Sequence, residues 1–588
     1  MENVNFAEIL QLFGCVVTST SNVKSNNLKD APSQCGILYQ PEQGVVLSHG
    51  SILADYCIAD KKLNNKINNG SPIEESDLGD AVFSTMIDRR WSPCELNTRS
   101  REEQHDSDNT NLSTDHCPEY RTLACRFICA FKNEDFSRAV SKFMPESTWS
   151  FETSQNITDV TDQDNSKQDM CEKLSFNLLS YFVILKTCPL TLTLSRTKLR
   201  KDYSLPLILR QQCRIGEAAE IVSTPFGSQN PSVFFNTYSV GVVCNVSGNE
   251  GCWIVTDARC IPGSEGGALF TGKGGQQRFL AGIIVASLCW KNKEWVGFSM
   301  ACSIRSVIES MFKTFKKIRC DNITSLLGAN LKPFHYLTNQ EINSSKTIEK
   351  NEEFLSSTVL IRVGNTWGSG VIVNCQKGII LTCSHVVKDT QHFTAMIKPY
   401  QGSQEYSAHV VYSNRNAPYG PLDIAVLTCP EATAHLCSKH IPKINTPQIG
   451  EKVLVIGHAL FSYDLNMHPS ITVGVVSKLI HSHEQLAIVQ STCAVHAGSS
   501  GGPLLNAQGD LIGIIVCNTV DKGSNACYPH LNLCVPAISL LSPLQRYLDS
   551  GDASAFAAYN VEDLTTKRLW ALDSNVLGER SSPTKSKL

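Results

Sequence analysis

Short apolar segments alternate with turn residues along most of the chain. Segments rich in Val, Ile and Leu recur between Gly, Pro and Asn positions, as at 378–382 and 422–427. Short β-branched runs bounded by turn residues are typical of β-strands, whereas helices need longer runs with a different periodicity. The pattern therefore predicts an all-β protein with many short strands.

The same apolar segments occur twice, in the same order. Self-similarity of this kind indicates two copies of one fold. We expect a first copy within residues 1–335 and a second copy at 353–547, joined by a polar linker at 336–352. The matched segments are 44–48 with 378–382, 215–217 with 449–451, 240–243 with 473–476, 263–269 with 498–504, and 282–285 with 513–516.

Polar stretches interrupt this pattern inside the first copy and after the second. Residues 59–170 are rich in Asn, Asp, Ser, Glu and Lys. Such a composition buries too little apolar surface to offset the entropy of ordering the chain. We expect a long flexible insertion there, with a short strand or helix near 123–131. A tail at 548–588 is expected to carry a short helix at 564–577.

Composition and charge exclude several classes of protein. The 588 residues are 42% hydrophobic and 18% charged, which is a globular composition. A net charge of −3 gives no basic footprint for nucleic acid. The longest apolar stretch, 178–194, is broken by Lys186 and Pro189, so no membrane-spanning helix is expected. Residues 1–16 have no basic region and do not resemble a secretory signal.

The cysteine content does not change this picture. There are 24 Cys residues, and without a secretory signal reduced thiols are expected rather than a disulfide framework. Cys125 and Cys129, with His116 and Cys117 nearby, are too loosely spaced to favour a zinc site. We expect neither a metal nor a cofactor.

The candidate chemistry lies in the second copy. Ser500 stands in the segment GSSGGP at 498–503, where glycine lets backbone N–H groups approach a reacting carbonyl. His385 follows the apolar run 379–382, and Asp423 precedes another such run. His, Asp, Ser is one of the known chain orders of a serine triad. The three residues together therefore predict a catalytic triad, although each alone has an ordinary structural explanation.

Each member of this set has a chemical role. Ser500 is a weak nucleophile that needs a base, and His385 can take its proton. Asp423 would hold the imidazole in the required tautomer and stabilise the imidazolium. The backbone N–H groups of Gly498 and Ser500 are the candidate donors of the oxyanion hole.

The first copy has lost this set. In ungapped alignment Glu265 replaces Ser500, Ser51 replaces His385, and Phe182 falls at the position of Asp423. His49 lies two residues from the histidine position, but a carboxylate cannot replace the Ser–His pair in acyl transfer. The first copy is therefore expected to be a degenerate domain that serves as a scaffold or selects substrates.

The second copy resembles the trypsin-like serine peptidases of the Deg/HtrA branch over residues 354–545. The resemblance rests on SGVIV at 369–373, LTCSHVV at 381–387, LDIAVL at 422–427 and GSSGGPLLNAQGDLIGII at 498–515. It implies a chymotrypsin-like fold, with two antiparallel β-barrels and the active site between them. The whole chain is then two tandem double-barrel units, of which the N-terminal one is degenerate. The PDZ domain that usually follows in this branch has no room in the 40 or so residues after the last predicted strand.

The resemblance also bears on specificity. In this fold the segment about six residues before the nucleophile lines the pocket for the residue that precedes the cleaved bond. Here that segment is Cys493, Ala494 and Val495, which carries no acidic residue. We therefore expect a small or apolar residue rather than Lys or Arg at that substrate position.

The sequence ends in Ser586-Lys587-Leu588, which has the form of a peroxisomal import signal. With this signal and no PDZ domain, the chain resembles the peroxisomal leader-peptide-processing proteases. That resemblance implies a matrix enzyme that removes leaders from imported proteins. Its expected partners are matrix protein substrates, the import receptor that binds the tripeptide, and a second copy of the chain; nucleic acid and membrane are not expected partners.

The same resemblance implies self-processing. The predicted insertion offers Cys94, followed by Glu95, and Cys117, followed by Pro118. Proline after the cleaved bond is unfavourable, so Cys94 is the preferred site. Two other functions stay open. One is a non-catalytic scaffold that binds exposed peptides by β-augmentation. The other is an esterase, which the GSSGGP setting disfavours because esterases place Ser in G-x-S-x-G.

Overall fold

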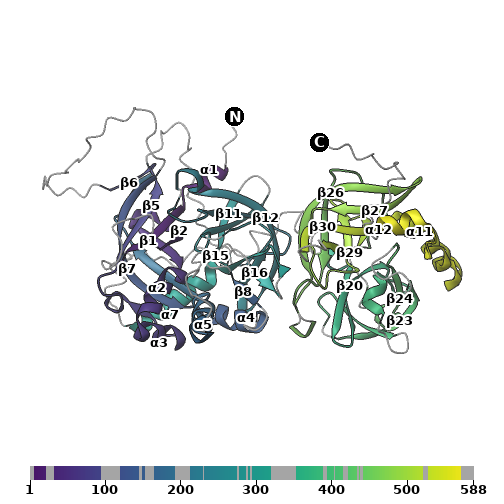
Figure 1. Cartoon of the computed structure of the whole chain (residues 1–588), viewed down its shortest axis with the longest axis horizontal. Coiled ribbons are helices and arrows are strands. Elements are labelled where there is room, and N and C mark those ends of the chain that lie inside the picture. The colour runs from purple at the N-terminus through teal and green to yellow at the C-terminus, as the bar shows by residue number, and fades with distance from the viewer. Residues whose placement is uncertain are drawn as a thin grey trace, which may run out of the picture. The chain divides into compact units, whose positions relative to one another are not determined.

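The computed structural model describes residues 6–20, 32–94, 120–144, 149–151, 165–192, 212–229, 231–261, 263–273, 277–286, 289–291, 294–318, 353–388, 394–402, 404–414, 421–433, 436, 441–461, 463–465, 467–520 and 527–570. They form two compact units (Figure 1). The first comprises residues 1–293 and 297–344, and the second 294–296 and 345–588.

The second unit contains two closed six-stranded barrels. Buried apolar residues alternate with more exposed ones along their strands: in β22, Ala395 and Ile397 are buried while the polar Thr394 and Lys398 are half-buried. The strand order is β19-β20-β21-β24-β23-β22 in one barrel and β25-β26-β27-β30-β29-β28 in the other. The bounds are β19 (Thr358–Val363), β20 (Thr366–Asn374), β21 (Ile379–Thr382), β22 (Thr394–Pro399), β23 (Tyr406–Ser413), β24 (Ala425–Thr428), β25 (Lys452–Gly457), β26 (Ser470–Ser482), β27 (Gln485–Ser491), β28 (Pro503–Asn506), β29 (Leu511–Val520) and β30 (Cys527–Pro536).

The first unit repeats this architecture. Its first sheet runs β4-β7-β5-β1-β2-β3-β9, and an additional β7–β9 pairing closes a ring of six strands. Its second barrel runs β11-β12-β13-β18-β15-β14. The bounds are β1 (Gly14–Thr20), β2 (Ser33–Gln40), β3 (Val45–His49), β4 (Ile73–Glu74), β5 (Val82–Asp88), β7 (Tyr120–Lys132), β9 (Tyr181–Lys186), β11 (Ala218–Ser223), β12 (Thr237–Ser247), β13 (Trp253–Thr256), β14 (Ala268–Lys273), β15 (Gln277–Ala286) and β18 (Ser299–Ser303).

If the six strands of each ring are numbered along the chain, the order of neighbours around the ring is first, second, third, sixth, fifth, fourth in all four rings. This identity of connection between the units confirms the all-β prediction of two tandem double-barrel units. Antiparallel neighbours close each ring, so the backbone donors and acceptors of every strand are used inside the barrel.

The predicted flexible insertion at 59–170 is wrong for much of its length. The barrel strands β5 and β7 lie within it, and β7 forms a ladder with β9 as well as with β5. Strand β7 faces solvent along part of its length and exposes Thr122 and Arg126, and β5 carries Ser84, Thr85 and Asp88 among its apolar residues. These polar residues obscure the apolar pattern. The strand or helix expected near 123–131 is the centre of β7. Residues 95–119, 145–148 and 152–164 lie outside the described part of the chain.

Helices cover the ends of the barrels. In α4 and α7 the buried residues recur three and four positions apart, as at Ile304, Val307, Ile308 and Met311, so one face packs on the strands. The short helix expected at 564–577 is seen as α12, which ends the described chain with Trp570 buried. The helices are α1 (Phe6–Gln11), α2 (Ala54–Ala59), α3 (Lys61–Asn68), α4 (Glu134–Phe143), α5 (Asn165–Leu178), α6 (Pro231–Phe234), α7 (Ile304–Ile318), α11 (Ile538–Ser550) and α12 (Leu564–Trp570).

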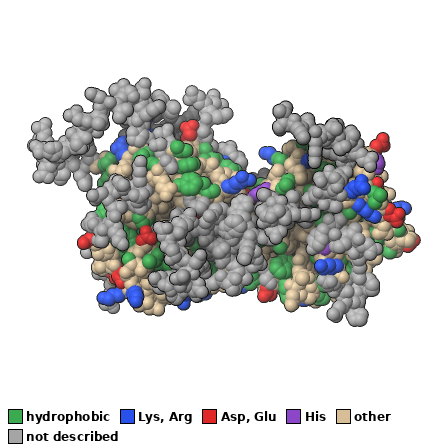
Figure 2. All heavy atoms as spheres, in the orientation of Figure 1, with side chains coloured by type: hydrophobic (Ala, Val, Ile, Leu, Met, Phe, Trp, Pro, Cys, Tyr) green, Lys and Arg blue, Asp and Glu red, His purple; other side chains and the backbone are tan. Residues whose placement is uncertain are grey.

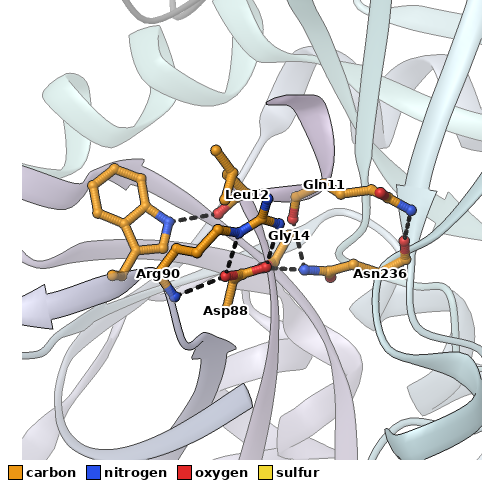
Figure 3. A network of polar contacts seen from close by, with 7 residues as sticks. Gln11, Leu12, Gly14, Asp88, Arg90 and Asn236 are labelled. Atoms are coloured by element: carbon orange, nitrogen blue, oxygen red, sulfur yellow. Dashed lines mark hydrogen bonds and ion pairs between the residues drawn. The ribbon is translucent and has the colours of Figure 1, made fainter. Parts of the chain in front are cut away.

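Side-chain amides join the two barrels of the first unit (Figure 3). Asn236, just before β12, donates from Nδ2 to the carbonyl oxygens of Gln11 at 2.7 Å and Gly14 at 2.9 Å. Gln11 Nε2 donates back to the Asn236 carbonyl at 2.8 Å. Beside them, Trp91 Nε1 donates to the Leu12 carbonyl at 2.7 Å. These bonds fix the start of β1 to the start of β12.

The surface is mixed in charge. On the face shown in Figure 2, basic and acidic side chains of the described residues are scattered among apolar and neutral polar ones. Among the described helices, none is both long and apolar enough to cross a membrane.

Candidate active site

Two glycines with positive φ shape the loop that carries Ser500. Gly498 has a φ of 92° and Gly501 has a φ of 84°, values that L side chains rarely adopt. A Cβ on Gly498 would also collide with the His458 carbonyl oxygen, and a Cβ on Gly501 with the Ser369 carbonyl oxygen. Glycine is therefore required at both positions, and the chain turns sharply on either side of Ser500.

His385 and Asp423 lie beside each other at the ends of paired strands. The β21–β24 ladder pairs Thr382 with Ala425, so the residues that follow β21 meet those that precede β24. Asp423 accepts from the His385 backbone N–H at 3.0 Å and lies 2.6 Å from His385 Nδ1. Asp423 is fully buried, and the His385 side chain is 9% exposed. This geometry orients the ring and leaves Nε2 as the atom that can exchange a proton.

The Ser500 loop is tied to the barrel that carries His385, through β20 and the residue after β21. The Ser500 carbonyl accepts from the Ser369 N–H at 2.8 Å, and the Cys383 thiol donates to the Ile515 carbonyl at 3.0 Å. A Cβ on Gly501 would lie 3.0 Å from the Cys383 backbone nitrogen. The Ser500 hydroxyl donates to the Val516 carbonyl at 3.0 Å in this structure. The structure thus brings the loop of the predicted nucleophile to the barrel that carries His385 and Asp423.

The predicted oxyanion donors are available. Within the described part of the chain, the backbone N–H groups of Gly498 and Ser500 have no hydrogen-bond acceptor, whereas the intervening Ser499 N–H donates to the His496 carbonyl at 2.9 Å. Both residues are half-buried, so their N–H groups are open to a ligand. The pair can receive the carbonyl oxygen of a substrate.

Ser369 is a site residue that the sequence analysis did not single out. Its hydroxyl donates to the Gly498 carbonyl at 2.8 Å and accepts from the His458 N–H at 2.9 Å. Trp367 Nε1 donates to the His458 carbonyl at 3.0 Å. Ser369 stands in the SGVIV motif, but only the folded loop reveals that it holds Gly498 in place.

His458 remains uncharged in this setting. Burial lowers its pKa to about 3, and the positive charges of His468 and Lys398 act in the same direction. Its imidazole is therefore a weak base near neutral pH.

The predicted specificity residues are buried. Cys493 and Val495 belong to the apolar core of their barrel, and Ala494 is 2% exposed. Asn532 Nδ2 donates to the Cys493 carbonyl at 2.8 Å, and Thr472 Oγ1 donates to the Ala494 carbonyl at 2.7 Å. The segment is therefore buried and uncharged, and its role in specificity stays a prediction.

Cys383, His385 and Asp423 also offer three ligand atoms within 4.8 Å of one another. All three residues are engaged otherwise, because the Asp423 carboxylate accepts from His385 and the Cys383 thiol donates to Ile515. The cluster supports a proton-transfer pair better than a metal site.

The other predicted sites lie in the first unit or outside the described chain. Cys94 follows β6 (Trp91–Pro93), and its N–H donates to the Pro189 carbonyl at 2.8 Å. Cys117 and the tripeptide Ser586–Leu588 lie outside the described residues.

In the first unit, strand register places Ser51 where His385 stands. The Ser48 hydroxyl donates to the Cys35 carbonyl at 2.6 Å, and the Thr382 hydroxyl donates to the Ser369 carbonyl at 2.7 Å. Ser48 and Thr382 are therefore equivalent positions. Ser51 lies three residues after the first and His385 three residues after the second. The counterpart of Asp423 needs a correction. The β3–β9 ladder pairs Val45 with Lys186 where β21–β24 pairs Ile379 with Thr428, which makes Tyr181 rather than Phe182 the equivalent residue.

The chain is similar to known peptidases. Residues 368–514 match the family model of the trypsin-like peptidase domain. The chain is 32% identical to the human (Homo sapiens) peroxisomal leader peptide-processing protease over 360 residues, 60% of this chain and 59% of that protein. It is 30% identical to the mouse (Mus musculus) protein of that name over 353 residues, 59% of this chain and 58% of that protein.

The chain is also similar to a bacterial protein, the periplasmic pH-dependent serine endoprotease DegQ of Escherichia coli. The two are 26% identical over 189 residues, 32% of this chain and 38% of that protein. The match to the human and mouse proteins spans about three fifths of their length.

Proposed function

We propose that the trypsin-like peptidase domain at 368–514 makes this chain a serine endopeptidase that processes peroxisomal proteins. The observation that carries the proposal is the buried Asp423–His385 pair, which lies next to the Ser500 loop with its two unoccupied N–H groups. The names of the human and mouse relatives support the substrate class, since both are called peroxisomal leader peptide-processing proteases.

The reaction follows the acyl-enzyme route. Ser500 Oγ attacks the scissile carbonyl carbon while His385 Nε2 takes the hydroxyl proton, and the carbonyl oxygen becomes an oxyanion bound by the N–H groups of Gly498 and Ser500. The C–N bond breaks as His385 returns the proton to the leaving amine. Water then attacks the Ser500 ester with His385 again as base, and the carboxylic acid product leaves with Ser500 restored. Asp423 stabilises the imidazolium in both halves.

The substrate residue before the cleaved bond is proposed to be small or apolar. The support is the uncharged segment Cys493–Val495, which has no carboxylate to pair with Lys or Arg. Mass spectrometry of the N-termini produced from candidate leader-bearing proteins identifies this residue directly.

The proposed location is the peroxisomal matrix. It is supported by the names of the relatives and by the sequence Ser586-Lys587-Leu588, which we propose to be bound by the import receptor. Self-association and cleavage of the chain by itself are further parts of this proposal.

A covalent probe tests the central claim. A fluorophosphonate labels only an activated serine, so it should label the full chain and fail to label Ser500→Ala. Absence of labelling in the folded wild-type chain would contradict the proposal and favour a non-catalytic scaffold that binds exposed peptides. Hydrolysis of small esters with no cleavage of any leader-bearing protein would favour an esterase.

A further inference from the structure

The loop of the first unit that corresponds to the Ser500 loop has the same backbone conformation. Gly263 and Gly266 have φ values of 91° and 85°, against 92° and 84° for Gly498 and Gly501. Residues other than glycine adopt such positive φ values only at an energetic cost. Two such glycines with the same spacing therefore indicate that the two loops share one backbone conformation.

The hydrogen bonds of the two loops agree as well. Each loop makes three equivalent backbone bonds of nearly equal length. They are Cys35 N to Glu265 O at 2.9 Å and Ser369 N to Ser500 O at 2.8 Å, Gly266 N to Ile284 O and Gly501 N to Ile515 O at 2.8 Å, and Gly267 N to Ser264 O and Gly502 N to Ser499 O at 2.9 Å. Glu265 thus occupies the backbone position of Ser500.

One donor differs between the loops. The Gly263 N–H, which corresponds to the unoccupied Gly498 N–H, donates to Glu265 Oε2 at 2.9 Å. Glu265 is 6% exposed, so its carboxylate is held inside the loop rather than directed to solvent. A backbone N–H that would bind an oxyanion in the second unit binds a carboxylate oxygen in the first.

Two buried thiols, those of Cys35 and Cys260, lie near the Glu265 side chain. The pKa values of the Cys35 and Cys260 thiols are raised, by burial above all, and the charge of Glu265 adds to the shift. Both thiols therefore stay protonated next to the carboxylate.

We propose that Gly263–Gly267 is a carboxylate-binding site that the chain fills from within: the Glu265 carboxylate takes the place of a substrate oxyanion and closes this site to peptide carbonyls. A tethered ligand competes at a high effective concentration, so a free acyl group is excluded. The first unit then keeps the loop conformation of a peptidase but neither binds a peptide carbonyl there nor cleaves a peptide bond.

Hydrogen exchange tests this site independently of any peptidase activity if every variant also carries Ser500→Ala. Glu265→Ala removes a charge-assisted bond, which typically contributes ~1.5–3 kcal/mol, so exchange of the peptide that covers Gly263–Gly267 should become faster by about tenfold or more. Concentrated sodium acetate should slow it again in Glu265→Ala, relative to sodium chloride of equal ionic strength. With Glu265 present, acetate should have no effect.

Two further variants control the result. Glu42→Ala removes an exposed carboxylate of the same unit and should change neither exchange nor the acetate response. Glu265→Gln keeps an acceptor oxygen without the charge and should exchange at an intermediate rate, which covers the case that Glu265→Ala does not fold. Unchanged exchange in both Glu265 variants, or equal protection by acetate when Glu265 is present, would overturn the proposal.

Discussion

Cys35 in the first unit and Ser369 in the second make the same three bonds to their loops. The Cys35 thiol donates to the Gly263 carbonyl at 3.0 Å and accepts from the Thr224 N–H at 2.9 Å, and its own N–H donates to Glu265. Ser369 bonds Gly498, His458 and Ser500 in the same way. The two units therefore hold their loops by equivalent hydrogen bonds, although only the loop of the second unit has a serine, Ser500, at the position of the nucleophile.

The first prediction concerns this support. Ser369→Ala leaves the Gly498 carbonyl and the His458 N–H without their partner, at a cost of about 1–3 kcal/mol for each buried group. We expect a lower kcat with KM less affected, because the oxyanion donor loses its position. Ser369→Cys should retain more activity than Ser369→Ala, since Cys35 fills this role in the first unit. Steady-state kinetics and thermal unfolding measure both effects, and the exposed Ser477→Ala is the matched control.

The second prediction concerns the proposed triad. Ser500→Ala should abolish cleavage of a leader-bearing substrate, and Asp423→Asn should lower kcat by roughly 10⁴-fold because the imidazole loses its orientation. The double variant with His385→Ala should be no worse than Ser500→Ala alone, since triad members act as a unit. Additive losses, or normal turnover by Ser500→Ala, would disprove the assignment.

The third prediction concerns pH and His49 in the first unit. Burial lowers the pKa of His49 from 6.5 to about 4. The unfolded chain therefore binds more protons than the folded chain between these two values, and stability is lost as pH falls from about 6.5 to about 4. One histidine contributes up to about 1.4 kcal/mol per pH unit, or about 3 kcal/mol over this window. Urea unfolding of wild type and His49→Gln at several pH values measures the difference in slope. Equal slopes would contradict the prediction.

The fourth prediction concerns self-cleavage. Wild-type chain incubated after purification should yield fragments that end at Cys94 or Cys117, and Ser500→Ala should stay full length. Cys94 closes a short paired strand, so it must leave the Pro189 carbonyl before it can enter an active site, and cleavage there should be slow. Denaturing gels over time and mass spectrometry of the fragments decide this. Identical fragments from both proteins would point to a contaminating protease.

The fifth prediction concerns import. Removal of Ser586–Leu588 should leave the chain in the cytosol with unchanged activity in vitro, because the tripeptide is proposed as a receptor contact only. Imaging of the truncated chain in cells that lack an intact copy tests it. Peroxisomal import of the truncated chain in such cells would show that another segment carries the signal.

The sequence by itself predicted the strands, the duplication and the candidate triad, because each depends on local chemistry. Apolar β-branched runs such as Ile379–Thr382 favour strands wherever they pair. The glycines at 498 and 501 indicate a turn whose positive φ values other residues rarely adopt. Its error over 59–170 has a physical reason. Strand β7 exposes the polar residues Thr122 and Arg126, and β5 carries polar residues among its apolar ones, so neither shows the pattern of an apolar strand. Each becomes a strand by pairing with a neighbour, β5 with β1 and β7 with β9.

Contacts between distant segments were decided by the tertiary structure alone. The bond of Ser369 to Gly498 joins residues 129 apart in sequence, and no local pattern marks it. The shift from Phe182 to Tyr181 follows from the strand register of β3 with β9, which ungapped alignment cannot supply. The Glu265 carboxylate, seen in sequence only as a lost nucleophile, turns back onto Gly263 because the folded loop directs an N–H toward it. Local sequence determines which backbone shapes are allowed, whereas hydrogen bonds that close between distant strands determine which atoms meet.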